Sequence, residues 1–121
     1  MVALNNFINF VAMEFLNKIE LQGYVGNVNV STVGDSKSVR FSLCTQQAYN
    51  EHGGVAMVEC TWFNCLAWEG TKTKGVSQLR SNDIVHLKGR VRAHSYVGAD
   101  GVAKYTWEVL CQELEILPKQ D

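Results

Sequence analysis

The chain contains one proline among 121 residues, and it has no internal repeat and no low-complexity tract. Its four cysteines show no Cys-x-x-Cys spacing, and none of its three histidines pairs with a cysteine at a spacing usual for a metal site. These absences argue against a disulfide framework and a structural zinc ion, and they favour free thiols in a reducing cytoplasm. No Gly-rich phosphate loop and no carboxylate pair stands out. We therefore expect no enzyme activity, no metal and no cofactor.

A membrane or secretion signal is also missing, although the first residues are apolar. No basic segment accompanies them, polar residues interrupt the run, and no stretch is long enough to span a bilayer. Apolar side chains instead recur at helical spacing, at Leu4, Phe7, Ile8, Val11 and Phe15. This spacing predicts an amphipathic helical extension over residues 1–16, whose apolar face would be covered by its own domain, a sister subunit or a partner protein.

Charge is nearly balanced over the whole chain, with a net value of −1 at pH 7, but it is unevenly distributed. Basic side chains outnumber acidic ones between Lys72 and Lys104, and the balance reverses from Glu108 onward. Such asymmetry favours a local anion-binding surface on an otherwise neutral molecule.

Two tryptophans stand on one predicted strand, within residues 60–68. Because side chains alternate between the faces of a strand, one face carries Trp62, Asn64, Leu66 and Trp68. The other face carries Phe63, Cys65 and Ala67. Only one face of a barrel strand is interior, so the alternation predicts that both indoles are exposed.

A second predicted strand, residues 84–96, is basic on one face and apolar on the other. The basic face carries His86, Lys88, Arg90, Arg92, His94 and Tyr96, and the apolar face carries Val85, Leu87, Gly89 and Val91. Cations interleaved with aromatic rings suit a flexible polyanion whose monomers have stackable rings, which describes single-stranded nucleic acid.

The remaining patterns predict three more strands and one short helix. A first strand occupies residues 18–25, the turn-rich segment 27–38 follows, and a second strand begins at Val39. A helix is expected within residues 71–80, and a last strand runs from Lys104 to Leu117. This order predicts an all-β domain over residues 17–117, a five-stranded Greek-key OB-fold barrel with one short helix between strands 3 and 4. Residues 118–121 form a short tail.

The same residues resemble the bacterial single-stranded DNA-binding protein family. The resemblance is carried, in chain order, by Asn17-Lys18-Ile19-Glu20-Leu21-Gln22-Gly23-Tyr24-Val25-Gly26, Val39-Arg40-Phe41-Ser42-Leu43-Cys44-Thr45, Thr61-Trp62-Phe63-Asn64 through Trp68-Glu69-Gly70, and Val85-His86-Leu87-Lys88-Gly89-Arg90-Val91-Arg92. It covers nearly the whole chain from Asn17 to Leu117, and no single motif would suffice.

The resemblance implies a homo-oligomer, usually a tetramer, that binds single-stranded DNA without sequence preference in replication, recombination and repair. It implies a cytoplasmic, nucleoid-associated protein that acts beside replication and repair proteins and away from membranes. Its stacking aromatics correspond here to Trp62, Trp68, Tyr49 and Tyr96. The chain departs from the family at Tyr49 and Tyr96, where tryptophan is common, and at Asn64, where a basic residue is frequent. It also departs in its N-terminal extension and in lacking the linker with an acidic tip that recruits other proteins.

Phosphate contacts are expected from six basic side chains, Arg40, Lys72, Lys74, Lys88, Arg90 and Arg92. Trp107 is expected in packing or a subunit contact, and Tyr24 and Tyr105 in packing. Gly23, Gly26 and Gly89 are interpreted as sites where the barrel bends or another strand comes close.

Two alternatives stay open at this point. The first is an OB-fold protein-interaction or primosome-assembly module with weak DNA affinity, which the near-zero net charge and the extension favour. The second is an enzyme with a cysteine nucleophile and a histidine base, taken from His52, His86 or His94. No motif in the sequence supports the second alternative.

Overall fold

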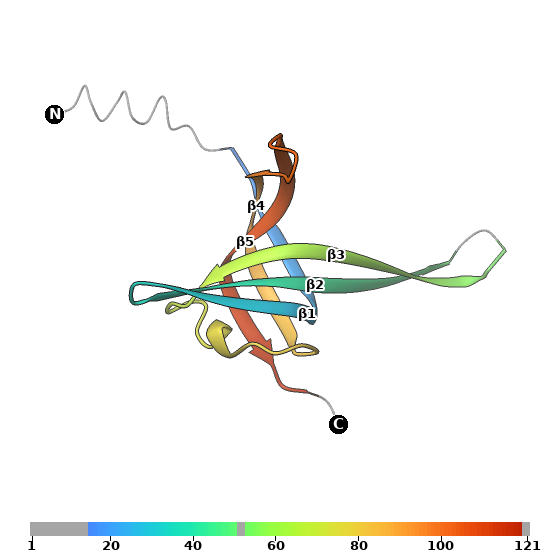
Figure 1. Cartoon of the computed structure of the whole chain (residues 1–121). Helices are drawn as coiled ribbons and strands as arrows, with labels where there is room; N and C mark the ends of the chain where they lie inside the picture. The colour runs from blue at the N-terminus through green and yellow to red at the C-terminus, as the bar shows by residue number, and fades with distance from the viewer. Residues whose placement is uncertain (1–14, 51–52, 120–121) are drawn as a thin grey trace, which may run out of the picture.

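The computed structural model describes residues 15–50 and 53–119, and it shows a closed barrel built from long, twisted strands (Figure 1). The strands and the single 3-10 turn are, in chain order, β1 (Ile19–Val33), β2 (Ser36–Asn50), β3 (Ala56–Trp68), η1 (Val76–Gln78), β4 (Ile84–Val97) and β5 (Ala103–Leu117). Around the barrel the strand order is β1-β2-β3-β5-β4. The predicted all-β barrel of five strands is therefore confirmed.

The barrel closes through one short parallel contact. β3 and β5 pair in parallel at Cys65 with Val109 and at Leu66 with Leu110, whereas the other pairings are antiparallel. Strand β5 thus lies between β3 and β4, which makes the arrangement a Greek key of the OB-fold type. Side chains on β2, β3, β4 and β5 can consequently meet on one outer surface.

The core forms as the alternation predicts. Val25, Leu43, Leu87 and Val109 are buried at the centre, each from a different strand. Two glycines allow strands to cross closely: a Cβ on Gly23 would lie 2.0 Å from the carbonyl oxygen of Cys44, and one on Gly89 would lie 2.0 Å from that of Leu110. Close approach of another strand is therefore the reason for glycine at both positions.

The first two strands are longer than the turn residues between them predict. β1 continues to Val33 after a bulge between Val25 and Val28, and only the two residues Gly34 and Asp35 separate it from β2. Gly34 has a φ of 59°, which favours glycine. The prediction of a turn-rich segment over residues 27–38 was wrong because cross-strand pairing outweighs the local preference of Asn, Ser and Gly for turns. The β2–β3 hairpin likewise extends to Asn50 and projects from the barrel (Figure 1).

The predicted helix within residues 71–80 is only a 3-10 turn of three residues, Val76–Gln78. Gly75 precedes it with a φ of 88°, a backbone conformation that an α-helix does not contain. The carboxylate of Glu69 accepts hydrogen bonds from the backbone N–H groups of Gly75 at 2.8 Å and Ser77 at 3.0 Å. This local network fixes a tight loop in place of a longer helix.

The predicted N-terminal helix lies outside the described residues, except for Phe15 and Leu16, which are exposed and in no regular element. The chain is fixed from Asn17, whose side-chain amide donates to the carbonyl of Val91 at 2.7 Å and accepts from its N–H at 3.1 Å. Within residues 15–50 and 53–119, no helix is long and apolar enough to cross a bilayer.

Candidate nucleic-acid interface

Trp62 on β3 lies across the outer surface of β2 and reaches β1. Its ring stands edge-on to the ring of Tyr24, with centroids 5.6 Å apart and planes at 84°. A Cβ on Gly26 would lie 2.8 Å from the indole, so glycine leaves the space that the ring occupies. Trp62 remains 54% exposed. The indole is therefore fixed in orientation yet open to solvent, as stacking requires.

Trp68 stands at the end of β3, opposite Ser38 on β2. It is 43% exposed, and its backbone carbonyl accepts a hydrogen bond from the hydroxyl of Thr73. Five residues of extended strand separate it from Trp62, so the two Cα atoms are roughly 20 Å apart. The predicted exposure of both indoles is confirmed, and the two rings lie on one face of β3, at its middle and at its end.

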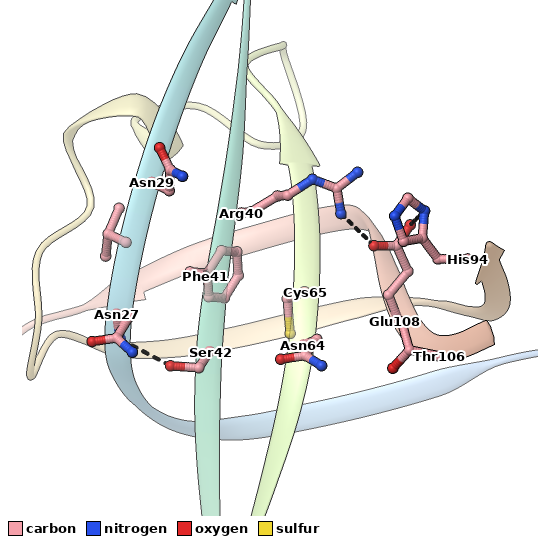
Figure 2. A pocket seen from close by; sticks show the side chains of 11 residues that line it. Asn27, Asn29, Arg40, Phe41, Ser42, Asn64, Cys65, His94, Thr106 and Glu108 are labelled. Atoms are coloured by element: carbon pink, nitrogen blue, oxygen red, sulfur yellow. Dashed lines mark hydrogen bonds and ion pairs between the residues drawn. The ribbon is translucent and has the colours of Figure 1, made fainter. Parts of the chain in front are cut away.

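A hollow of about 300 Å³ opens on the same outer surface (Figure 2). Side chains from all of the strands line it: Asn27, Val28, Asn29, Arg40, Phe41, Ser42, Asn64, Cys65, His94, Thr106 and Glu108. Asn64 lies between the two tryptophans along β3, two residues after Trp62. The expected site residues Arg40 and Asn64 are thus brought together with the indoles on one face.

Two arginines from separate strands meet at one buried carboxylate beside this hollow. Arg40 on β2 donates through Nη1 to Oε2 of Glu108 at 2.5 Å (Figure 2). Arg92 on β4 donates through Nε to Oε1 of the same carboxylate at 2.8 Å. Glu108 is 3% exposed, whereas the arginine side chains are 49% and 38% exposed. Burial acts to raise the pKa of Glu108, but the hydrogen bonds and charges of both arginines outweigh it and lower this pKa below its usual value.

The same ion pair explains an unexpected burial. Leu66 shares the outer face of β3 with the two tryptophans, yet it is only 4% exposed. Arg40 lies opposite Leu66 on β2, and its guanidinium reaches Glu108 on the far side of β3. The arginine side chain therefore crosses over β3 at Leu66, covering apolar surface with its methylene groups.

Strand β5 places acidic residues beside the predicted basic face of β4. The register pairs Glu108 with Arg92, Glu113 with Lys88 and Glu115 with His86. His86 also lies 2.5 Å from Glu20 on β1. The basic face is consequently partly neutralised, and the acidic C-terminal segment of the sequence is its neighbour in space.

The other expected site residues are spread over the barrel. Lys72 and Lys88 line a separate hollow of about 290 Å³ with His86, Glu113 and Glu115. Lys74 and Arg90 are exposed on the loop before η1 and on β4. The structure does not bring these four cations into the hollow between the tryptophans.

The two tyrosines differ in placement. Tyr96 is 46% exposed and lies on the same face of β4 as Arg92 and His94. Tyr49 is 42% exposed near the end of β2, where alternation puts it on the opposite face of the hairpin from Arg40 and Ser42. Tyr96 thus extends the face that carries the arginines, and Tyr49 belongs to the projecting β2–β3 arm.

Sequence reasoning missed Glu108 and the role of Tyr24. In the sequence, Glu108 is only the first residue of an acidic segment. Alternation places it on the face opposite the core residues Val109 and Cys111, so no local signal indicates that it is buried between two cations. Tyr24 contacts the ring of Trp62, so its packing is against the candidate site. Trp107 and Tyr105 are 70% and 76% exposed, so the prediction that either packs within this barrel was wrong. The subunit contact expected of Trp107 stays a prediction.

Three of the four cysteines, Cys44, Cys65 and Cys111, are buried, and Cys60 is exposed on β3. A hydrogen bond with Cys111 and burial raise the pKa of the Cys65 thiol, which keeps it protonated.

A five-stranded OB-fold barrel with exposed indoles beside arginines is an architecture suited to binding nucleic acid. The sequence model of the Single-strand binding protein family matches residues 16–117, and the chain belongs to this family. The family consists of non-enzymatic DNA-binding proteins, so the enzyme alternative is rejected.

Relatives agree with this assignment, and a solved structure shares the fold. A single-stranded DNA-binding protein of Neisseria meningitidis is 25% identical over 104 residues, covering 84% of this chain and 60% of that protein. A single-stranded DNA-binding protein of Chlorobaculum tepidum is 26% identical over 109 residues, covering 88% of this chain and 67% of that protein. The chain thus spans about 60% of the Neisseria relative's length. The Plasmodium falciparum SSB in complex with ssDNA has the same fold, with a TM-score of 0.74, 20% identity and coverage of 87% of this chain and 97% of that one.

Proposed function

We propose that this protein binds single-stranded DNA without sequence preference, and that it protects and organises such strands in replication, recombination and repair. The observation that carries the proposal is the pair of half-exposed indoles, Trp62 at the middle of β3 and Trp68 at its end, beside an arginine-flanked hollow that Asn64 of the same strand lines. Family membership and relatives that are single-stranded DNA-binding proteins support it.

The two kinds of side chain divide the binding free energy between them. Stacking of a base on an exposed ring contributes about 1 to 3 kcal/mol, and it requires a base whose face is free. Arg40 and Arg92 bind phosphates and release counterions, a contribution that duplex DNA also receives. Discrimination against duplex therefore comes from the rings, and the rings accept any base.

The proposed site centres on residues of one outer surface: Trp62, Trp68, Tyr96, Arg40, Asn64 and Arg92. A longer DNA strand would continue from this site to Tyr49 on the β2–β3 arm and to the cations Lys72, Lys74, Lys88 and Arg90. Because carboxylates of β5 stand beside Lys88 and Arg92, fewer phosphates are neutralised than the number of cations implies.

We also propose that the protein works as a homo-oligomer, specifically a tetramer as is usual in the family. It would act in the cytoplasm, on the nucleoid, together with replication and repair proteins. Trp107 and Tyr105 supply an exposed aromatic surface on β5, on the opposite face from Glu108 and Thr106. Aromatic side chains without neighbouring charge are typical of protein interfaces. This surface is the proposed subunit contact.

Titration with oligo-dT, followed by intrinsic tryptophan fluorescence at moderate salt, tests the function. Two of the three tryptophans would contact bases, so we expect strong quenching by single strands and little change with a duplex of the same length. An unchanged emission together with no gel shift would reject DNA binding. That result would favour the alternative of an OB-fold protein-interaction or primosome-assembly module. The carboxylates that partly neutralise the β4 cations are the observation that supports this alternative.

A further inference from the structure

A buried carboxylate in the centre of a proposed anion-binding surface needs an explanation. Glu108 lines the hollow between the tryptophans and repels any phosphate that approaches it. Removing a carboxylate from water is also costly unless it is paired. The residue therefore contributes something that offsets both costs.

The geometry of its partners indicates what that contribution is. Arg40 and Arg92 stand on β2 and β4, which are not neighbours in the barrel, and Glu108 on β5 is the group that both contact. Each of its oxygens accepts from one arginine. Arg40 uses Nη1 and Arg92 uses Nε, so the other N–H donors of the two guanidinium groups remain for a ligand.

We propose that Glu108 is a positioning residue, which holds Arg40 and Arg92 side by side so that together they bind one phosphate of the DNA strand. This inference rests on the proposed function. Without Glu108, the two guanidinium groups would repel each other, and the long side chain of Arg40 would lose its fixed path across β3. With Glu108, the cluster keeps a net positive charge, and its arginines are already ordered when DNA arrives.

Besides Cys65, whose buried thiol lines the same hollow, His94 is the other titratable group near this carboxylate. Its Nδ1 lies 3.9 Å from Oε1 of Glu108, and its side chain is 38% exposed at the edge of the hollow. Among the described residues the cluster therefore consists of two arginines, one histidine and one carboxylate.

The substitution Glu108→Gln distinguishes a positioning role from simple charge repulsion, because the two roles predict opposite changes in DNA affinity. If Glu108 only repelled phosphate, its removal would tighten binding to oligo-dT and steepen the salt dependence. If it positions the arginines, we expect binding about tenfold weaker, the loss typical of one charge-assisted hydrogen bond. We also expect the slope of log affinity against log salt to shrink by roughly 0.7, the value for one phosphate.

Matched variants complete the experiment. Glu59→Gln removes the same charge from an exposed position on β3 and should leave affinity unchanged or slightly higher. Glu108→Asp keeps the charge, but its side chain is too short to reach both arginines, so it should also lower the slope of log affinity against log salt. This variant replaces Glu108→Gln in the test if Glu108→Gln does not fold. In an Arg40→Ala background, Glu108→Gln should add little further loss.

The outcomes distinguish the two proposals. Absence of oligo-dT binding by the unaltered protein at low salt would overturn the proposed function and this inference with it. Normal binding by the unaltered protein, with unchanged or tighter binding by folded Glu108→Gln, would overturn the positioning role alone. Weaker binding with an unchanged salt slope in both Glu108 variants would also overturn it, because a merely structural role lowers affinity without losing a phosphate contact.

Discussion

The indole of Trp62 on β3 rests on the backbone of Gly26 on β1, at a place where a Cβ would stand 2.8 Å from the ring. The ring therefore spans the width of β2. Tyr24 meets it edge-on from the same strand as Gly26. One exposed aromatic platform thus depends on residues of β1 for its orientation.

Replacement of Trp62 by alanine should weaken oligo-dT binding by roughly 5-fold to 150-fold, the equivalent of one lost stack. The ring is 54% exposed and outside the core, so the free energy of unfolding should change little. Fluorescence anisotropy of a labelled strand measures the first effect and thermal unfolding the second. Unchanged affinity in a folded variant would remove Trp62 from the site.

Gly26→Ala should weaken binding by roughly 3-fold to 10-fold, equal to about 0.7 to 1.4 kcal/mol, by pushing the indole out of position. The new methyl would also stand 2.6 Å from Oγ of Ser42. Gly70→Ala is the control, since its nearest contact would be an ordinary 3.5 Å. Equal affinities of the two variants, measured by the same anisotropy titration, would show that Gly26 has no part in orienting the ring.

The faces of the strands could be predicted from the sequence, because alternation depends on neighbouring residues alone. Trp62 and Phe63 point to opposite sides as expected, and the buried residues of β4 are those of its apolar face. The aromatic half of the candidate site followed from this pattern.

Which strands adjoin each other, and in which register, could not be predicted from local pattern. Glu108 stands beside Arg92 because β5 pairs with β4 across a register shift at Lys88 and Gly89. Arg40 reaches the same carboxylate only because β3 alone separates β2 from β5. Such long-range pairing depends on the whole barrel, so the charge cluster was invisible in the sequence.

Glu69 should make the stability of the loop before β4 depend on pH. Hydrogen bonds from the Ser77 backbone, opposed by desolvation and aided by the Gly75 N–H, lower the pKa of this carboxyl below its usual 4.5. A pKa lowered in the folded state means stability that is present above the unfolded pKa and is lost as pH falls through the folded one. The melting temperature of the unaltered protein should therefore fall more steeply than that of Glu69→Gln from about pH 5 downward. Parallel melting curves of the two proteins over this range would contradict the assignment.

Trp107→Ala should shift the protein toward smaller assemblies while leaving binding of a short oligo-dT nearly unchanged. The indole is 70% exposed, and it lies opposite Ala93 in the β4–β5 pairing, on the face turned away from Arg92 and Glu108. An exposed tryptophan has apolar surface to bury, about 25 cal/mol for each Å² removed from water, and a second copy of the chain would cover it. Sedimentation velocity over a range of concentrations measures the change, and Tyr96→Ala on the other face is the matched control, which should lower affinity without altering assembly. If Trp107→Ala sediments as the unaltered protein does, the contact between subunits lies elsewhere on the barrel.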